Sequence, residues 1–121
     1  MKEADVQAIS HTRIGAALYS KFVKQRFIFP DPKAEPGKFT EQLLNLLKKE
    51  KYDCVLALEE STTKILLKNK EEIEKYTSAL LTTVQNFDKA NDKWEVLKMA
   101  VELNVPVPES YAPETPEEIN A

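Results

Sequence analysis

The feature that most restricts the fold is a continuous apolar run at residues 52–58, Tyr-Asp-Cys-Val-Leu-Ala-Leu. The run has the length of a strand and lacks the polar/apolar alternation of a strand with one exposed face. Such runs are typical of strands that are covered on both faces, as in a parallel sheet. The run therefore predicts a buried strand, with Cys54 as a buried and unreactive thiol.

Helical and strand-like segments alternate around this run. Residues 38–51 have the apolar spacing of an amphipathic helix, with Phe39, Leu43, Leu46 and Leu47 on one face. We expect strands at 5–9 and 26–29, helices at 12–24, 61–69, 70–78 and 84–90, a loop at 31–37, and a brief strand or turn at 80–83. The alternation favours an α/β fold with a parallel sheet, and we expect its core to include Tyr19, Phe22 and Phe27.

The last helix has the clearest end signals. Asp92 and Glu95 have the spacing of a capping box, which predicts a helix that begins there and runs to about Leu103. Asn104 suits the left-handed position after a helix. The buried stripe of this helix is expected to be Trp94, Leu97, Ala100 and Val101. A further helix start is predicted at Thr115.

Composition and charge exclude several classes of protein. Lys and Arg number 17 and Asp and Glu 20, so the net charge of -3 does not favour binding to phosphate backbones. No apolar run approaches the ~20 residues of a membrane helix, and residues 1–7 lack the apolar stretch of a signal peptide. One cysteine and one histidine exclude an internal disulfide and a His-rich metal centre. Two distant glycines cannot build a glycine-rich phosphate loop. We therefore expect a cytoplasmic protein with no nucleic-acid or membrane partner.

Several short motifs follow one another in an order that is typical of one enzyme family. Residues 20–23 (Ser-Lys-Phe-Val) precede 27–32 (Phe-Ile-Phe-Pro-Asp-Pro), Lys38-Phe39 opens a helix, and residues 52–56 are an aspartate-bearing strand start. Residues 59–62 (Glu-Glu-Ser-Thr) follow the strand, and 91–93 (Asn-Asp-Lys) pair with 104–108 (Asn-Val-Pro-Val-Pro) as a domain junction. In these motifs the chain resembles the N-terminal, pre-ATP-grasp portion of ATP-grasp ligases, in the carbamoyl-phosphate-synthase-like or carboxylate–amine ligase branch.

The resemblance implies a Rossmann-like pre-ATP-grasp domain at residues 1–83, followed at 84–121 by a junction helix and the beginning of an ATP-grasp domain. The family has a first strand ahead of the one expected at 5–9. Without that strand a gap with unpaired edges would separate the strands at 5–9 and 53–58. The family's later elements would lie beyond residue 121. We therefore expect a domain fragment that is inactive alone and whose partner is the remainder of an ATP-grasp domain, from the same gene or a partner chain.

The complete enzyme would use ATP and Mg²⁺ to activate a carboxylate as an acyl phosphate, which an amine then captures. The resemblance makes Lys93 the lysine that faces the ATP phosphates, where fixed positive charge is useful. The alternative is an exposed lysine at a helix start, a placement that the helix dipole mildly disfavours. No catalytic residue and no metal ligand are assigned to this chain.

Glu59 and Glu60 come directly after the strand at 52–58. Ligands of open α/β sheets gather at the carboxyl ends of the strands, and the resemblance implies that one of these acids, Glu60 before Glu59, faces the amine or carboxylate substrate. The alternative is a loop acid or a helix cap. Ser10 and His11 follow the first strand and should border the same crevice, His11 as a locally bonded side chain.

Two other functions stay open. One is a non-catalytic α/β binding or regulatory domain that forms a homo-oligomer through open sheet edges, because unpaired strand edges are templates for pairing. The other is a nucleotide-binding protein of flavodoxin-like topology, which the lack of a phosphate loop disfavours.

Overall fold

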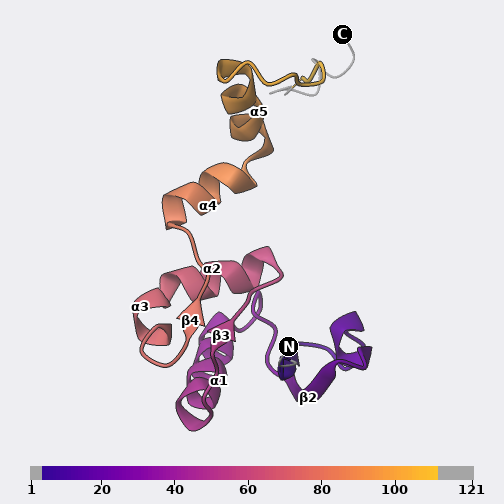
Figure 1. Cartoon of the computed structure of the whole chain (residues 1–121), viewed down its shortest axis with the longest axis vertical. Coiled ribbons are helices and arrows are strands. Elements are labelled where there is room, and N and C mark those ends of the chain that lie inside the picture. The colour runs from indigo at the N-terminus through magenta and orange to yellow at the C-terminus, as the bar shows by residue number, and fades with distance from the viewer. Residues whose placement is uncertain (1–3, 112–121) are drawn as a thin grey trace. The chain divides into compact units, whose positions relative to one another are not determined.

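The computed structural model describes residues 4–111. The chain divides into two compact units, one ending at Leu81 and the other beginning at Thr82, and each is described by itself. The first unit contains, in order, β1 (Val6–Ser10), the 3-10 helix η1 (Ala16–Tyr19), β2 (Val23–Ile28), α1 (Pro36–Lys49), β3 (Cys54–Val55), α2 (Glu60–Lys68), α3 (Lys70–Ile73) and β4 (Ser78–Ala79). The second contains α4 (Val84–Asn91) and α5 (Lys93–Glu102) (Figure 1).

Both sheets of the first unit are parallel and have two strands. In one, β1 pairs with β2 and places Ile9 opposite Phe27. In the other, β3 pairs with β4 and places Val55 opposite Ala79. These parallel pairs with intervening helices confirm the α/β class. Within the described residues no ladder joins β1 to β3, so the two strands that were expected to be separated by a gap belong to different sheets.

The core of the first unit forms where α1, α2 and α3 gather around β3 and β4 (Figure 1). Its buried side chains are Phe39, Leu43, Leu47, Ile65, Leu66, Ile73 and Ala79. Ile9 of β1 and Phe29, which follows β2, pack against this core. The rings of Phe29 and Phe39 lie edge to face, with 5.8 Å between their centroids. The Tyr52 hydroxyl donates to Gln7 Oε1 at 2.6 Å, which ties β1 to the segment ahead of β3.

The strand predicted at 52–58 is present and parallel, but it is shorter than expected and is not buried on both faces. Only Cys54–Val55 pairs as a strand, and Cys54 is exposed rather than buried. Val55 and Ala57 pack on the core, whereas Leu56 and Leu58 are 64% and 87% exposed. Side chains alternate between the faces of a strand. One face of the run therefore meets the helices, while no described residue buries the other.

The helix predicted at 12–24 is also wrong. The structure has only the four-residue η1 there, and β2 begins at Val23 because residues 23–28 pair along β1. Tyr19 and Phe22, expected in the core, are 72% and 70% exposed. Beyond α2, the short α3 ends at Ile73. Residues 80–83, expected to form a brief strand or a turn, form no strand, and the two-residue β4 lies just before them.

The end signals of the last helix are confirmed, but its predicted burial is not. Asp92 Oδ1 accepts hydrogen bonds from the backbone N–H groups of Trp94 (2.9 Å) and Glu95 (3.1 Å). Asn104 has a φ of 55°, the left-handed conformation. The expected stripe is not buried, since Trp94 is 39% exposed and Val101 59%. The helix start predicted at Thr115 lies outside the described residues.

Candidate functional site

A cleft of about 780 Å³ lies at the carboxyl ends of three strands of the first unit. Its lining residues are His11, Asp31, Lys33, Glu59, Glu60, Ser61 and Lys64. His11 follows β1, Asp31 and Lys33 follow β2, and Glu59 leads from β3 into α2. The structure therefore brings Glu59, Glu60 and His11 to one site, beyond the carboxyl ends of strands from both two-stranded sheets.

The turn after β2 holds Asp31 as an anion. Its Oδ1 accepts a hydrogen bond from the backbone N–H of Lys33 at 2.8 Å, and its carbonyl accepts one from Glu35 N–H at 2.8 Å. The bond from Lys33 lowers the pKa of Asp31. Partial desolvation opposes this shift, and the backbone of Ala34 and the nearby charge of His11 support it. The cleft thus has a fixed carboxylate on its β2 side.

The first turn of α2 forms the opposite side of the cleft. Glu59 occupies the N-cap position with extended backbone, and its carbonyl accepts from Thr63 N–H at 2.9 Å. Within the described residues, the Glu59 carboxylate makes no capping hydrogen bond. Glu59 therefore caps α2 through its backbone and not through its side chain. Glu60 pairs with Lys64 at 2.5 Å. Ser61 Oγ is shielded from solvent and has no hydrogen-bond partner within the described residues.

The lining combines both signs of charge around a helix start. Asp31, Glu59 and Glu60 are acidic, whereas Lys33 and Lys64 are basic. The N-terminus of α2 adds a partial positive charge. Such a lining can bind a small molecule that has an ammonium group at one end and a carboxylate at the other.

Lys93 is not part of this cleft lining. It belongs to the second unit, where it is the exposed first residue of α5, directly after the capping Asp92. Sequence analysis missed Asp31, Lys33, Ser61 and Lys64. The first two could have been found by asking which side chains follow the predicted strand at 26–29.

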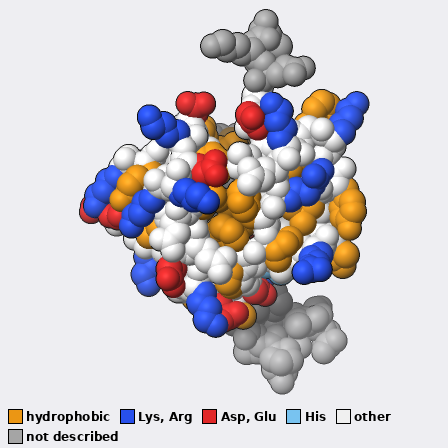
Figure 2. All heavy atoms as spheres, turned by 90° about the horizontal axis from the view of Figure 1, so that it is seen from below, with side chains coloured by type: hydrophobic (Ala, Val, Ile, Leu, Met, Phe, Trp, Pro, Cys, Tyr) orange, Lys and Arg blue, Asp and Glu red, His pale blue; other side chains and the backbone are white. Residues whose placement is uncertain are grey.

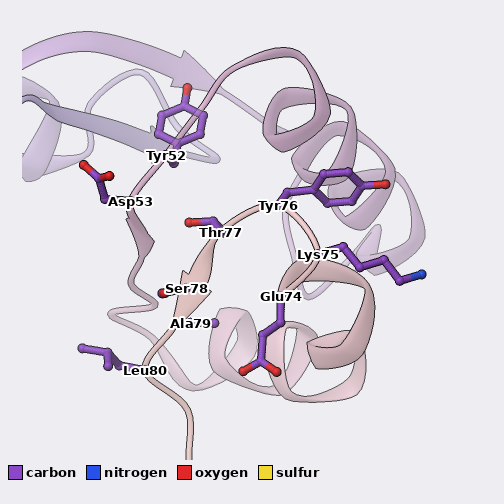
Figure 3. Close-up of a pocket in the computed structure, with 9 residues that line it drawn as sticks. All are labelled: Tyr52, Asp53, Glu74, Lys75, Tyr76, Thr77, Ser78, Ala79 and Leu80. Atoms are coloured by element: carbon purple, nitrogen blue, oxygen red, sulfur yellow. The ribbon is translucent and has the colours of Figure 1, made fainter.

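A second, shallower cleft of about 680 Å³ lies beside β3 and β4 (Figure 3). In Figure 3 the Thr77 side chain points toward the segment of Tyr52 and Asp53, while Lys75 points away from it. Thr77 is 7% exposed, and its hydroxyl has no hydrogen-bond partner within the described residues. Burial raises the pKa of Tyr52, and the charge of Glu50 adds to the effect. No pattern in the sequence points to this cleft.

Comparison with protein-family models, with curated proteins and with solved structures finds no match. Across residues 4–111, no group of three or more His, Cys, Asp or Glu side chains is placed to hold a metal ion. Nor does any helix in this range combine the length and the apolar content needed to cross a membrane.

Proposed function

We propose that the first unit is the substrate-side domain of an ATP-dependent carboxylate–amine ligase of the ATP-grasp type. The observation that carries the proposal is the mixed-charge cleft at the carboxyl ends of β1, β2 and β3. A ligase of this class must hold a carboxylate and an amine near each other. The cleft offers cations for the first and anions for the second.

In this proposal the side chains of the cleft bind and orient substrate. Lys33 holds a substrate carboxylate, and the partial positive charge of the α2 N-terminus favours the same group. Glu59 holds an ammonium group, and Asp31 supports it from the opposite side. Holding the two reactants in one orientation removes much of the entropic barrier to their reaction.

ATP and Mg²⁺ would be held by the remainder of an ATP-grasp domain, on the same gene product or on a partner chain. The described residues do not form a magnesium site, and the sequence has no glycine-rich phosphate loop. Lys93 is the residue proposed to face the ATP phosphates in the complete enzyme, and the chain alone is proposed to be inactive.

The proposal is tested by ¹H–¹⁵N correlation spectra of the full chain, titrated separately with alanine as a zwitterion, acetate, methylamine and Mg-ATP. We expect alanine to shift the amide signals of Lys33, Glu59 and Ser61 more than either single-charge probe. Glu59→Gln should weaken this response, whereas Glu71→Gln, an equal change on the exposed surface of α3, should not. The proposal fails if alanine leaves the cleft signals unchanged, or if Mg-ATP alone shifts Lys93 and is hydrolysed.

A second candidate function is the self-associating α/β binding domain, which a different observation favours. Leu56 and Leu80 directly follow Val55 and Ala79, the last paired residues of β3 and β4. Leu56, Leu58 and Leu80 are 64%, 87% and 80% exposed. An apolar face next to short, open parallel strands can pair with a second copy of itself.

Sedimentation velocity over a range of concentrations tests this candidate. We expect a dimer that Leu56→Ser with Leu80→Ser abolishes, while Leu103→Ser, at a position 72% exposed in the second unit, leaves it intact. Cys54 is the only cysteine, so its reaction rate with a thiol reagent should fall as the dimer forms. A monomer at every concentration contradicts self-association and leaves the ligase proposal unaffected.

A further inference from the structure

The segment from Arg13 to Phe22 presents its apolar side chains to solvent. Ile14, Tyr19 and Phe22 are 79%, 72% and 70% exposed. We call residues 12–26, which contain this segment and the first four residues of β2, the η1 lobe. In Figure 1 the lobe projects from the first unit on the side of β2 away from α1, α2 and α3. Large apolar side chains clustered on a surface commonly mark an interaction site.

The η1 lobe is also the most basic part of the chain. No Asp or Glu occurs between Asp5 and Asp31, although the whole chain has a net charge of -3. The lobe carries the cations Arg13, Lys21, Lys24 and Arg26. Figure 2 shows hydrophobic side chains with Lys and Arg side chains among them on its right, the side on which Figure 1 places β2.

Among the described residues, one of these four cations is neutralised by a carboxylate. Lys24 pairs with Asp5 at 3.3 Å, but within residues 4–111 no carboxylate lies within ion-pair distance of Arg13 or Lys21. The Lys21 ammonium lies 5.2 Å from the centre of the Phe22 ring. Charge and apolar surface are therefore presented together, on adjacent side chains.

Local contacts hold the lobe in this form. The Arg26 guanidinium donates to the carbonyl of Leu18, and its Nη2 donates to the carbonyl of Ser20 at 3.5 Å. The Tyr19 hydroxyl donates to the Arg13 carbonyl at 3.3 Å. Leu18 is buried beneath the turn at 6% exposure. The backbone is thus anchored to β2, while the apolar side chains stay on the outside.

We propose that the η1 lobe is a surface for peripheral binding to anionic membranes. Interfacial binding combines shallow burial of apolar side chains with attraction between basic residues and acidic headgroups. Ile14, Tyr19 and Phe22 supply the first, and Arg13 and Lys21 supply the second. The expectation of no membrane partner rested on the lack of a spanning segment, and a surface contact does not need one.

Single-stranded nucleic acid fits these observations less well. Its binding sites combine a basic groove with aromatic rings on which the bases stack. The lobe residues line neither of the two clefts described above. The most exposed apolar side chain of the lobe, Ile14, is aliphatic and offers no stacking surface, whereas a lipid interface accommodates aliphatic and aromatic side chains alike.

The test is co-sedimentation of the full chain with vesicles of equimolar phosphatidylcholine and phosphatidylserine, and with vesicles of phosphatidylcholine alone. We expect binding to the anionic vesicles only, with a strong decrease as salt is raised. The double variant Arg13→Glu and Lys21→Glu should bind at least about tenfold more weakly. Ile14→Ser with Phe22→Ser should weaken binding while leaving the charge unchanged.

The matched control is Lys49→Glu with Lys51→Glu, which makes the same charge change at exposed positions outside the lobe. Far-UV circular dichroism should show an unchanged fold in all of these variants, because the substituted side chains are exposed. The proposal is overturned if the chain ignores anionic vesicles, or if the control weakens binding as much as the lobe variants do. It is equally overturned if a labelled thymidine oligonucleotide, rather than the vesicles, binds in a lobe-dependent way.

Discussion

Helices α1 and α5 have similar sequence patterns but different environments. Both have apolar residues at helical spacing and a clear beginning and end. In α1, Phe39, Leu43 and Leu47 are buried to 5% exposure or less. In α5 no residue is buried, and Met99 and Val101 remain 42% and 59% exposed.

The difference arises from the partners that the fold provides. The apolar face of α1 packs against α2, α3 and β4 within the first unit. Within the second unit, the element that contacts α5 is α4, which is itself without a buried residue. An amphipathic pattern states which face can be buried, and the stabilisation comes only when a second apolar surface covers it.

The largest effect that would test this comparison is expected in the core of the first unit. Leu43→Ala removes a side chain that is 2% exposed, and the transfer and cavity costs together should lower the free energy of unfolding by about 3 kcal/mol. Urea unfolding followed by far-UV circular dichroism measures it. The counterpart in α5, Val101→Ala, should change stability by no more than about 0.5 kcal/mol. Equal losses would show that α5 is packed as tightly as α1.

A smaller effect is expected at the start of α5, where capping hydrogen bonds, and not burial of side chains, stabilise the helix. Asp92→Ala removes the acceptor for two backbone N–H groups and should cost about 1 kcal/mol of local helix stability. Hydrogen exchange at the amides of Trp94 and Glu95 should accelerate accordingly. Asp92→Asn keeps a capping oxygen and should preserve protection. If these amides exchange as slowly in the Asp92→Ala variant as in the Asp92→Asn variant, the cap does not stabilise α5.

The C-terminal end of α5 depends on backbone conformation. Val105 N–H donates to the Ala100 carbonyl at 2.8 Å, and Asn104 N–H to the Val101 carbonyl at 3.0 Å, which requires the left-handed φ of Asn104. Asn104→Gly should be neutral or slightly stabilising, whereas Asn104→Ala should cost roughly 1 kcal/mol. Exchange rates in the last turn of α5 measure both. Slower amide exchange in the Asn104→Ala variant than in the natural chain would contradict the left-handed conformation of residue 104.

The smallest effect is expected ahead of α1, at Asp31. Its folded pKa is lowered, chiefly by the backbone hydrogen bond from Lys33. The resulting stabilisation is complete above the pKa of an unfolded aspartate and is lost as the pH falls through the lower, folded pKa. The urea midpoint of Asp31→Asn should therefore vary less with pH in acid than that of the natural chain. Identical pH profiles would mean that the turn does not favour the ionised carboxylate.

The parts that could be predicted from sequence were those with local causes. The helix at 38–51 was predicted because its period is visible along the chain, and the Asp92 cap because the donors lie two and three residues away. The grouping of Glu59, Glu60 and His11 followed from the rule that parallel strands present their carboxyl ends on one edge. Lys33 and Lys64 were missed because neither belongs to a motif and only the fold brings them to the same cleft.

By itself, the sequence determined the α/β class, the ends of its last helix and the absence of a glycine-rich loop, because hydrophobic period, capping distance and residue count are local properties. Only the tertiary structure decided that Cys54, Leu56 and Leu58 face outward, that residues 23–25 join a strand, and that Tyr19 and Phe22 are exposed. Burial and strand pairing depend on segments far apart in the chain. An apolar residue is therefore buried only where the fold brings another surface to cover it.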